Sequence, residues 1–451
     1  MPERLRERIR AALPAGALAR NTAWMVAGNG SRLLLQAATF VAITRALGTA
    51  GYGAFAGVLA MVSLAVPFVG VGAGSIMIRN TARAEDAFAR SYRTALLVTA
   101  VSGAVLFLAA LALAPLILPT TIARGLIAAV AASDLLVAGF YDVSWKVYQA
   151  HRRMRRVAQL HFTLSALKLG AALALVWLVP SPTPLSWGVL YAAANLLGTT
   201  VAMLWSWREV CAAAREGPAP AFDPREGSYF SSSLAAQNIY NDLDKAMLAR
   251  ISTLDATGIY AAAYRLIEIA YVPVRSLFYA AYADFFQHGA GGARATLRFG
   301  RRLMPVGVGY AVAAGLLILL VAPILPMLSG AGYREAADAA RWLALIPALR
   351  ATHQFASDIL TGANYQGRRT LTQIAVAAAN IGFNLWLIPG YGWRGAAWAS
   401  LLSDGLLALL MWCIVWGAVR GEDAREVTSA AVAGTAPAES AEPSMPAEAV
   451  A

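Results

Sequence analysis

The chain has 451 residues, of which 59% are hydrophobic and only 14% are charged. A soluble domain carries about 25% charged residues, so this composition excludes a soluble globular protein and predicts one that crosses a membrane several times. The net charge of +12 arises from basic residues spread over separate short segments. Because these residues form no single basic patch or motif, we expect no nucleic-acid partner.

Apolar segments long enough to cross a bilayer as helices recur along nearly the whole chain. Each has about 20 residues or more, enough to span a hydrocarbon core of roughly 30 Å. We therefore predict an all-α polytopic membrane protein with twelve transmembrane helices. The expected helices lie at residues 21–44, 53–78, 92–118, 122–149, 157–179, 185–207, 228–250, 257–287, 303–328, 335–361, 370–389 and 394–418.

Arginines alternate between dense and sparse in the connections between these segments. Dense groups precede the first segment and follow the second, fourth, sixth, eighth and tenth, as with Arg79 to Arg93 and Arg152 to Arg156. The intervening connections hold mostly single arginines, such as Arg45 and Arg124. By the positive-inside rule this pattern places both termini in the cytoplasm, and an even number of spans agrees with that.

The two ends of the chain differ in composition from the rest. Residues 1–20 carry apolar residues at helical spacing among arginines, which predicts a cytoplasmic amphipathic helix on the membrane surface. Residues 421–451 are rich in Ala, Pro, Glu, Ser and Thr without apolar periodicity, which predicts a disordered cytoplasmic tail. Cys211 and Cys413 have no second Cys or His at metal-ligand spacing, so we expect neither a metal nor a cofactor.

The second half of the chain repeats features of the first at a displacement of about 205 residues. Tyr52-Gly53-Ala54-Phe55 corresponds to Thr257-Gly258-Ile259-Tyr260. Six helices per half bring the chain back to the same side, so we predict a parallel repeat of two six-helix bundles with a solute site between them near the midplane. The expected units are an N-lobe at 21–210, a cytoplasmic linker at 211–227 and a C-lobe at 228–420.

Only three lysines accompany thirty-four arginines, and each lies in an apolar segment: Lys146, Lys168 and Lys245. A lysine at membrane depth is a compact, strongly hydrated charge that can meet a phosphate in a wet cavity. The alternative is that each lysine pairs with a neighbouring acid. Asp142 lies four residues before Lys146, and Asn241 lies four residues before Lys245.

Five charges fall near the middle of expected spans, where each costs roughly 2.5 to 3.5 kcal/mol on insertion scales. They are Arg32, Lys168, Arg275, Arg350 and Asp404. The four cations have no acid three or four residues away, which makes them candidates for binding an anion. Arg265 with Glu268 and Asp338 with Arg341 have such spacing and are interpreted as structural pairs. The candidates for sugar contact or ion coupling are Asp134, Asp242, Asp244, Asp404 and Asn241.

Helix-breaking residues interrupt three expected spans. Pro67 lies with Gly70, Gly72 and Gly74 in the second span, Pro273 lies in the eighth, and Pro347 lies in the tenth. These positions predict breaks or kinks at which the helices bend.

Several short motifs, in order along residues 20 to 418, resemble the polysaccharide flippases (Wzx-type, O-antigen and exopolysaccharide exporters) of the MATE-like MOP superfamily. The motifs are Asn21-Thr22-Ala23-Trp24, Arg45-Ala46-Leu47-Gly48 followed by Tyr52-Gly53, Gly70-Val71-Gly72 with Ile78-Arg79, the region of Asp244, and Gly258-Ile259-Tyr260-Ala261-Ala262-Ala263.

This resemblance implies a flippase of the bacterial inner membrane and not an enzyme. The implied substrate is an undecaprenyl-diphosphate-linked oligosaccharide, moved by alternating access through a cationic cavity lined by Arg32, Lys168, Arg275, Arg350, Lys245 and Lys146. H⁺ or Na⁺ as coupling ion, and polysaccharide polymerase and chain-length proteins as partners, remain open. Three other interpretations are a multidrug antiporter of the same architecture, a major-facilitator sugar transporter, and a membrane enzyme acting on lipid-linked glycan.

Overall fold

A computed structural model describes residues 17–151, 153–213, 217, 222–289 and 291–434 of the protein. These residues form helices and short connections, and no strand occurs among them. Within this part, eight helices are long and apolar enough to cross a membrane. They are Arg32–Phe68, Phe88–Ile117, Arg124–Ala150, Met154–Leu178, Pro184–Glu209, Gly292–Val321, Gln366–Tyr391 and Trp393–Glu422. An all-helical, multi-pass membrane protein is confirmed, while the count of twelve spans stays a prediction.

The first half of the chain forms helices along each of its expected spans. In order these are α2 (Ala17–Ser63), η1 (Val66–Phe68), α3 (Ala73–Arg83), η2 (Glu85–Ala87), α4 (Phe88–Ile117), α5 (Arg124–Ala131), η3 (Ala132–Val137), α6 (Ala138–Ala150), α7 (Met154–Leu178), α8 (Pro184–Glu209) and η4 (Cys211–Ala213). The segment η3 is a single π-helical turn inside one span, because α5 and α6 continue directly from either end of it.

The second half has the elements α9 (Pro224–Ile251), α10 (Leu254–Gly289), α11 (Gly292–Val321), α12 (Ile324–Ser329), η5 (Ala331–Tyr333), α13 (Arg334–Leu343), α14 (Ile346–Gly362), α15 (Gln366–Tyr391) and α16 (Trp393–Gly434). The expected spans at 228–250 and 257–287 lie within α9 and α10, and the one at 335–361 is divided between α13 and α14.

The expected break in the second span occurs, because the chain leaves α2 after Ser63 and α3 begins only after Gly72, whose φ is +69°. A further kink lies at Gly48, where φ is +66°, a value that favours glycine. Pro347 stands in the first turn of α14. The prediction of an interruption at Pro273 was wrong, since α10 continues through it. Pro273 is exposed on α10, and its missing backbone N–H removes one hydrogen bond without ending the helix.

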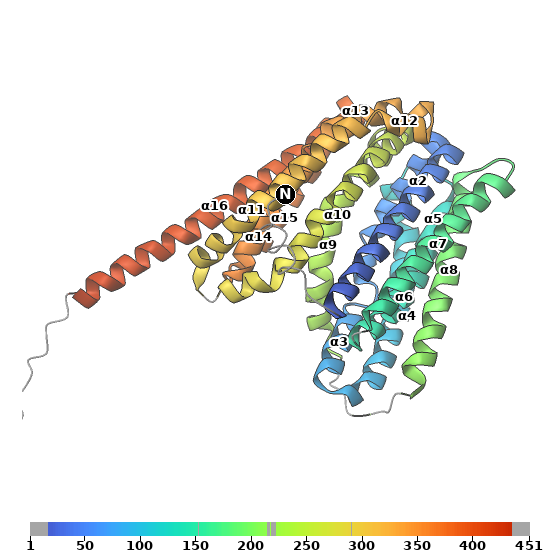
Figure 1. The fold of residues 1–451 in the computed structure, drawn as a ribbon. Helices are drawn as coiled ribbons and strands as arrows, with labels where there is room; N and C mark the ends of the chain where they lie inside the picture. Colours follow the sequence, from blue (N-terminus) through green and yellow to red (C-terminus); the bar gives the residue numbers. More distant parts are fainter. Residues whose placement is uncertain (1–16, 152, 214–216, 218–221, 290, 435–451) are drawn as a thin grey trace, which may run out of the picture.

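The helices form two groups that meet at one end of the molecule and separate toward the other (Figure 1). Helices α2 to α8 make up one group and α9 to α16 the other (Figure 1). The groups join where α2 packs against α10. The lobe boundaries and the internal repeat remain predictions, but this division is the arrangement that a cavity between two bundles requires.

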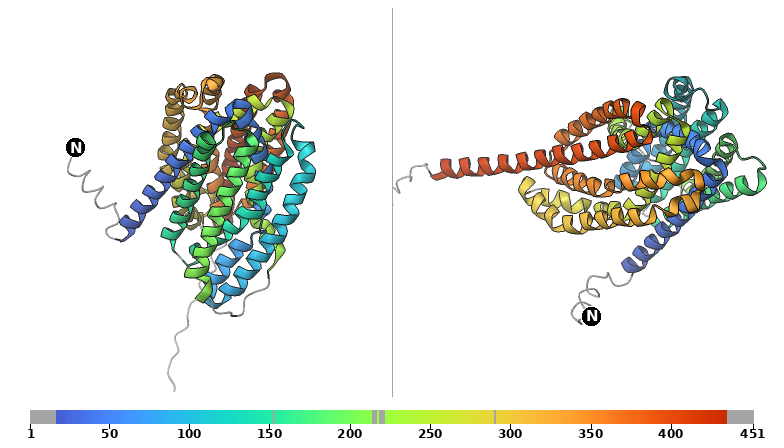
Figure 2. Two further views of the ribbon diagram at one scale, coloured as in Figure 1. Left: turned by 90° about the vertical axis from the view of Figure 1, so that its right-hand side faces the viewer. Right: turned by 90° about the horizontal axis from the view of Figure 1, so that it is seen from above.

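Helix α16 continues beyond the apolar span to Gly434 and projects away from the helix groups (Figure 2). Residues 421–434, which were expected in the disordered tail, are therefore helical here. Ala, Glu and Arg in this segment favour helix, which explains why the helix extends past its apolar part. The rest of the tail, and residues 1–16 of the expected amphipathic segment, lie outside the described residues.

The expected topology can be tested by labelling single cysteines in a variant that lacks Cys211 and Cys413. Ser181 between α7 and α8, and Arg334 at the start of α13, are exposed, as are Arg90 in the first turn of α4 and Arg298 in the second turn of α11. We expect a membrane-impermeant maleimide added to intact cells to label Ser181→Cys and Arg334→Cys, and Arg90→Cys and Arg298→Cys only after permeabilisation. Labelling of all four in intact cells would contradict this topology.

Candidate functional site

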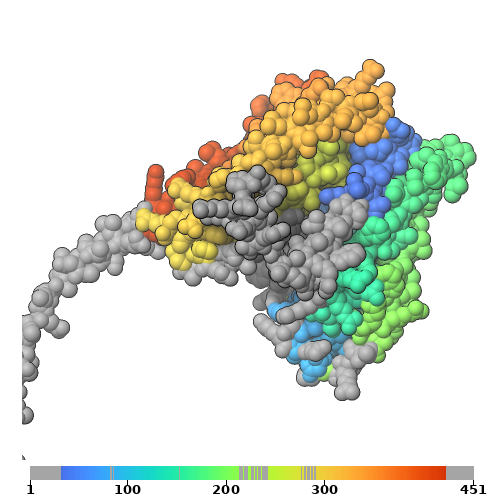
Figure 3. All heavy atoms as spheres, in the orientation of Figure 1, coloured from blue at the N-terminus to red at the C-terminus, as the bar shows by residue number. Residues whose placement is uncertain are grey.

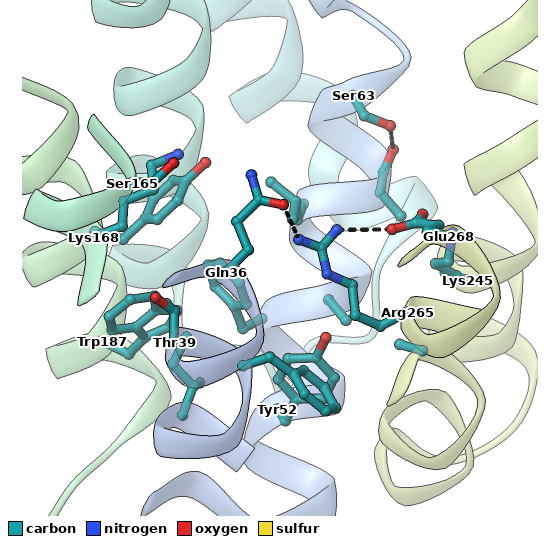
Figure 4. A pocket seen from close by; sticks show the side chains of 18 of the residues that line it. Gln36, Thr39, Tyr52, Ser63, Ser165, Lys168, Trp187, Lys245, Arg265 and Glu268 are labelled. Carbon is teal, nitrogen blue, oxygen red and sulfur yellow. Dashed lines mark hydrogen bonds and ion pairs between the residues drawn. The ribbon is translucent and has the colours of Figure 1, made fainter. Parts of the chain in front are cut away.

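A cavity of about 470 Å³ lies between the two groups of helices (Figure 4). Helices α2, α7 and α8 line it from one group, and α9 and α10 line it from the other. Its polar and aromatic lining includes Arg32, Gln36, Thr39, Tyr52, Ser63, His161, Ser165, Lys168, Trp187, Tyr191, Asp242, Lys245, Arg265 and Glu268.

Helical periodicity explains how these side chains reach the same space. Arg32, Gln36 and Thr39 follow one another at spacings of four and three residues, so they share one face of α2. His161, Ser165 and Lys168 repeat that spacing on α7, and Arg265 and Glu268 are three residues apart on α10. In Figure 4 Gln36 and Thr39 of α2 stand between Lys168 on one side and Arg265 on the other.

The charges that line the cavity are predominantly positive. Four cations and two acids are among its lining residues, which leaves an excess of positive charge: Arg32, Lys168, Lys245 and Arg265 against Asp242 and Glu268. Arg32 and Lys168 lie on helices that are long and apolar enough to cross a membrane, and a charge at that depth is tolerated only where water or an anionic ligand can reach it.

The two cations on the α7 side of the cavity are Arg32 and Lys168. Among the described residues, neither Arg32 nor Lys168 has an ion pair within 4 Å of a carboxylate. The Nζ atom of Lys168 lies 4.5 Å from the centroid of the Tyr191 ring, a cation–π contact. The Tyr191 hydroxyl in turn donates to Asp134, with an O–O distance of 3.0 Å to Oδ1.

Asp134 lies behind this lining, on the π-helical turn η3, and does not line the cavity. Its carboxylate accepts hydrogen bonds from Tyr191, Ser133 and, at 3.4 Å, the Nδ2 atom of Asn195. These are three neutral donors. Because Tyr191 touches both Asp134 and Lys168, it links the buried acid to the lysine in the cavity.

On the α9 and α10 side, the cations are paired. The Nζ atom of Lys245 lies 2.6 Å from Oδ1 of Asp242, and the ring centroid of Tyr264 is 4.1 Å from the same nitrogen. Ser63 of α2 donates to Asp242 at 3.3 Å. Asp242 was expected to contact sugar or a coupling ion, and the structure gives it a place in the cavity as the partner of Lys245.

Arg265 is a cavity residue that sequence analysis set aside. Its Nη1 atom lies 2.8 Å from Oε2 of Glu268, as the spacing predicted, but Nη2 also donates to Gln36 of α2 at 3.1 Å (Figure 4). A local pair was interpreted as structural, yet here it lies between the two helix groups. Only the tertiary contact with α2 distinguishes Arg265 from an ordinary helical ion pair.

Arg350 does not line the cavity, in contrast to the expectation from its sequence. Its guanidinium is buried among α10, α14 and α16, donates to the hydroxyl of Tyr264, and has Nε 3.7 Å from Oδ2 of Asp404. His353 lies 3.2 Å from the same carboxylate. Asp404 is on another helix, 54 residues along the chain, so a search for acids three or four residues away could not find this pair.

Three further candidates, Lys146, Arg275 and Asp244, also lie outside the lining of this cavity. Lys146 pairs with Asp142 at 2.6 Å, which supports the structural alternative. Arg275 is exposed, with the centroid of the Tyr271 ring 6.0 Å from its Cζ atom. Asp244 is buried and accepts from Tyr260 and from Ser400 at 3.2 Å. The side chain of Asn241 lies outside the described residues.

Comparison with known proteins identifies the family. The family described as polysaccharide biosynthesis protein matches residues 18–282, more than half of the chain. The chain belongs to this family. A comparison with curated protein sequences gives no match.

Solved structures establish the fold of this polysaccharide biosynthesis protein. The inward-facing conformation of a multidrug resistance MATE family transporter of the MOP superfamily is 15% identical, with 88% of this chain and 96% of that chain covered and a TM-score of 0.70. The outward-facing conformation of a multidrug resistance MATE family transporter of the MOP superfamily gives 16% identity, coverage of 87% of this chain and 92% of that chain, and a TM-score of 0.60.

A third structure is a MOP superfamily transporter from Pyrococcus furiosus, for which a reversed polarity of the binding pocket was taken to suggest a different function. It is 16% identical, with 88% and 93% of the two chains covered and a TM-score of 0.63. Family and fold together describe a multi-pass membrane protein of the polysaccharide biosynthesis family with the fold of these structures.

The difference between cavity cations and buried paired cations predicts a difference in stability. Replacing Arg350 by Met leaves the carboxylate of Asp404 buried without its guanidinium partner. We expect this to lower the free energy of unfolding by about 3 to 5 kcal/mol. Lys168→Met removes a cation that forms no ion pair with a described carboxylate, so we expect a much smaller decrease in the free energy of unfolding. Thermal unfolding of both purified variants in detergent measures the difference. Equal losses of stability would contradict this assignment.

Proposed function

We propose that the protein moves an undecaprenyl-diphosphate-linked oligosaccharide from the inner to the outer leaflet of the bacterial cytoplasmic membrane, for O-antigen or exopolysaccharide synthesis. The observation that carries the proposal is the excess of positive charge in a cavity between the two helix groups. The family supports the pathway, and the MOP fold supports transport as the activity.

A diphosphate is the ligand that best matches the charges of the cavity. Arg32 and Lys168 present cations without a carboxylate partner, and a charge-assisted hydrogen bond from such a group to phosphate is about twice as strong as a neutral one. Lys245 and Arg265 face them from the other helix group. A diphosphate placed between the groups would therefore meet positive charge from both.

The size and the lining of the cavity suit the head of such a lipid. Ligand sites have volumes of roughly 300 to 1,000 Å³, so about 470 Å³ receives a diphosphate and the first sugars rather than a whole glycan. Tyr52 and Trp187 offer aromatic surfaces to sugar rings, and Gln36 and Thr39 offer hydrogen bonds. The lipid chain would remain in the bilayer.

Alternating access between two lobes is the mechanism that the arrangement of helices supports. The groups are joined at the end of α12 and apart at the other end (Figure 1). The higher TM-score against the inward-facing transporter agrees with a cavity open toward the cytoplasm. We further propose that the N-lobe and the C-lobe rock about this junction, with both termini in the cytoplasm.

Coupling of this movement to H⁺ or Na⁺ remains a part of the proposal. Asp134 is the acid best placed for it, because its hydrogen-bond donors are neutral and Tyr191 lies between it and the lysine in the cavity. Asp244 and Asp404 are tied into the second helix group. We propose no role in this mechanism for polysaccharide polymerase and chain-length proteins, which stay predicted partners.

Export of an organic cation is the competing function, since the structural neighbours include multidrug transporters. A positively charged cavity repels such a substrate. We therefore expect reconstituted protein to move a lipid-linked pyrophosphoryl sugar between leaflets, and not ethidium. Export of ethidium without movement of the sugar lipid would overturn the proposal.

Neutralising the cavity cations tests the role of charge. A hydrogen bond to a charged group contributes about 1.5 to 3 kcal/mol, so Lys168→Gln and Arg32→Gln should each reduce the initial rate of flipping about tenfold or more. Arg341→Gln is the matched control, because Arg341 forms an exposed ion pair with Asp338 outside this cavity. Native rates in both cavity variants, in proteoliposomes with confirmed insertion, would exclude this role.

A further inference from the structure

The two helix groups touch through backbone at a pair of glycines near the end of α12. A Cβ atom added to Gly53 of α2 would lie 1.8 Å from the carbonyl oxygen of Leu254, and one added to Gly258 of α10 would lie 2.0 Å from that of Thr49. Real Cβ atoms essentially never come closer than 3.0 Å to another heavy atom. Only glycine allows α2 and α10 to approach so closely, a use of small residues that is common between membrane helices.

The contact is reciprocal. Each glycine faces the carbonyl group that lies four residues before the other glycine, Thr49 before Gly53 and Leu254 before Gly258. These are the positions that the sequence repeat relates. The contact is therefore locally two-fold, at the place where an axis between two rocking lobes is expected.

Polar contacts surround the glycines, and they all join α2 to the second helix group. Thr49 donates through Oγ1 to the carboxylate of Asp255, and the hydroxyl of Tyr333 donates to the carbonyl of Gly48 at 2.9 Å. Arg45 donates to the carbonyls of Met327 and Leu328 near the C-terminal end of α12, where helix carbonyls lack intrahelical partners. We call these contacts, with Gly53 and Gly258, the outer seam.

The outer seam closes one end of the space between the groups. In Figure 3 the surface of α2 adjoins that of the α12 region at this end, whereas the groups diverge toward the opposite end (Figure 1). The cavity begins just inside the seam, because Tyr52 and Phe55 line it and flank Gly53 in sequence.

We propose that the outer seam is the gate between the cavity and the outer side of the membrane, and that it opens by separation of Gly53 from Gly258. The proposal rests on the alternating access proposed above but not on the identity of the substrate. A contact of bare backbone suits a gate, because no side chain has to repack when it parts. Three of the surrounding hydrogen bonds involve a charged group, Arg45 or Asp255, and all three are exposed. Because water can replace either partner of an exposed hydrogen bond, its net contribution is modest, and the closed state is held reversibly.

Substitution of either glycine tests the gate directly. Alanine has a higher helix propensity than glycine, so the substitution does not weaken either helix. At position 53 or 258, however, the Cβ atom of alanine fits only if the outer seam opens. We expect Gly53→Ala and Gly258→Ala to increase the fraction of molecules with an open outer side about tenfold or more. This fraction is measured from the distance between spin labels at Ser181→Cys and Arg334→Cys, in a variant that lacks the native cysteines. A second pair, at Arg90→Cys and Arg298→Cys, should report closure of the inner side.

Gly309→Ala and Gly382→Ala are the matched controls, since both glycines are helical and a Cβ at either meets no atom within 4 Å. They should leave both distance distributions unchanged. Native distributions in Gly53→Ala and Gly258→Ala would overturn the gate. The distance measurements need no substrate, so their outcome does not depend on whether the protein flips the sugar lipid.

A disulfide across the seam provides a second test that adds no bulk at the glycines. In Thr49→Cys with Asp255→Cys, oxidation should hold the seam closed and reduce transport of the sugar lipid at least tenfold, with recovery on reduction. Either single variant is the control. Native transport by fully cross-linked protein would show that the seam does not open during the cycle.

Discussion

A charge inside the hydrocarbon of a membrane must either meet an opposite charge or reach water, and this constraint organises the polar interior of the protein. The structure shows both solutions. Arg350 is buried against Asp404 and Tyr264, where its charge holds three helices together. Lys168 and Arg32 instead point into a cavity and have no carboxylate partner among the described residues.

The second solution gives the site its chemistry. A cation that the protein leaves without an acid is available to an anionic ligand, and two such residues face two further cations across the cavity. The acids that accompany them, Asp242 and Glu268, each hold one cation of their own helix, Lys245 and Arg265. The result is a positive cavity in which two cations, Lys245 and Arg265, are paired with acids, and two, Arg32 and Lys168, can contact a ligand.

Much of the fold was predictable from sequence, because membrane helices satisfy their backbone within each segment and therefore have a strong local signal. Apolar length located the helices, and glycine and proline located the break after Ser63. The functional role of each charge was less predictable. Lys168 lines the cavity and Lys146 lies beside Asp142. Arg350 is paired with Asp404 outside the cavity, whereas Arg265 lies in it. Spacing along one helix reveals Glu268 beside Arg265 but cannot reveal Asp404 beside Arg350.

The sequence by itself determined that the chain is a multi-pass helical membrane protein, because hydrophobicity and charge density are properties of each segment alone. It also determined the small set of charges that have to be accommodated at membrane depth. Only the tertiary structure decided which of these charges share a cavity and which neutralise one another, since that depends on partners far apart in the chain. The same holds for Gly53 and Gly258, whose contact exists only because two helices cross at those positions.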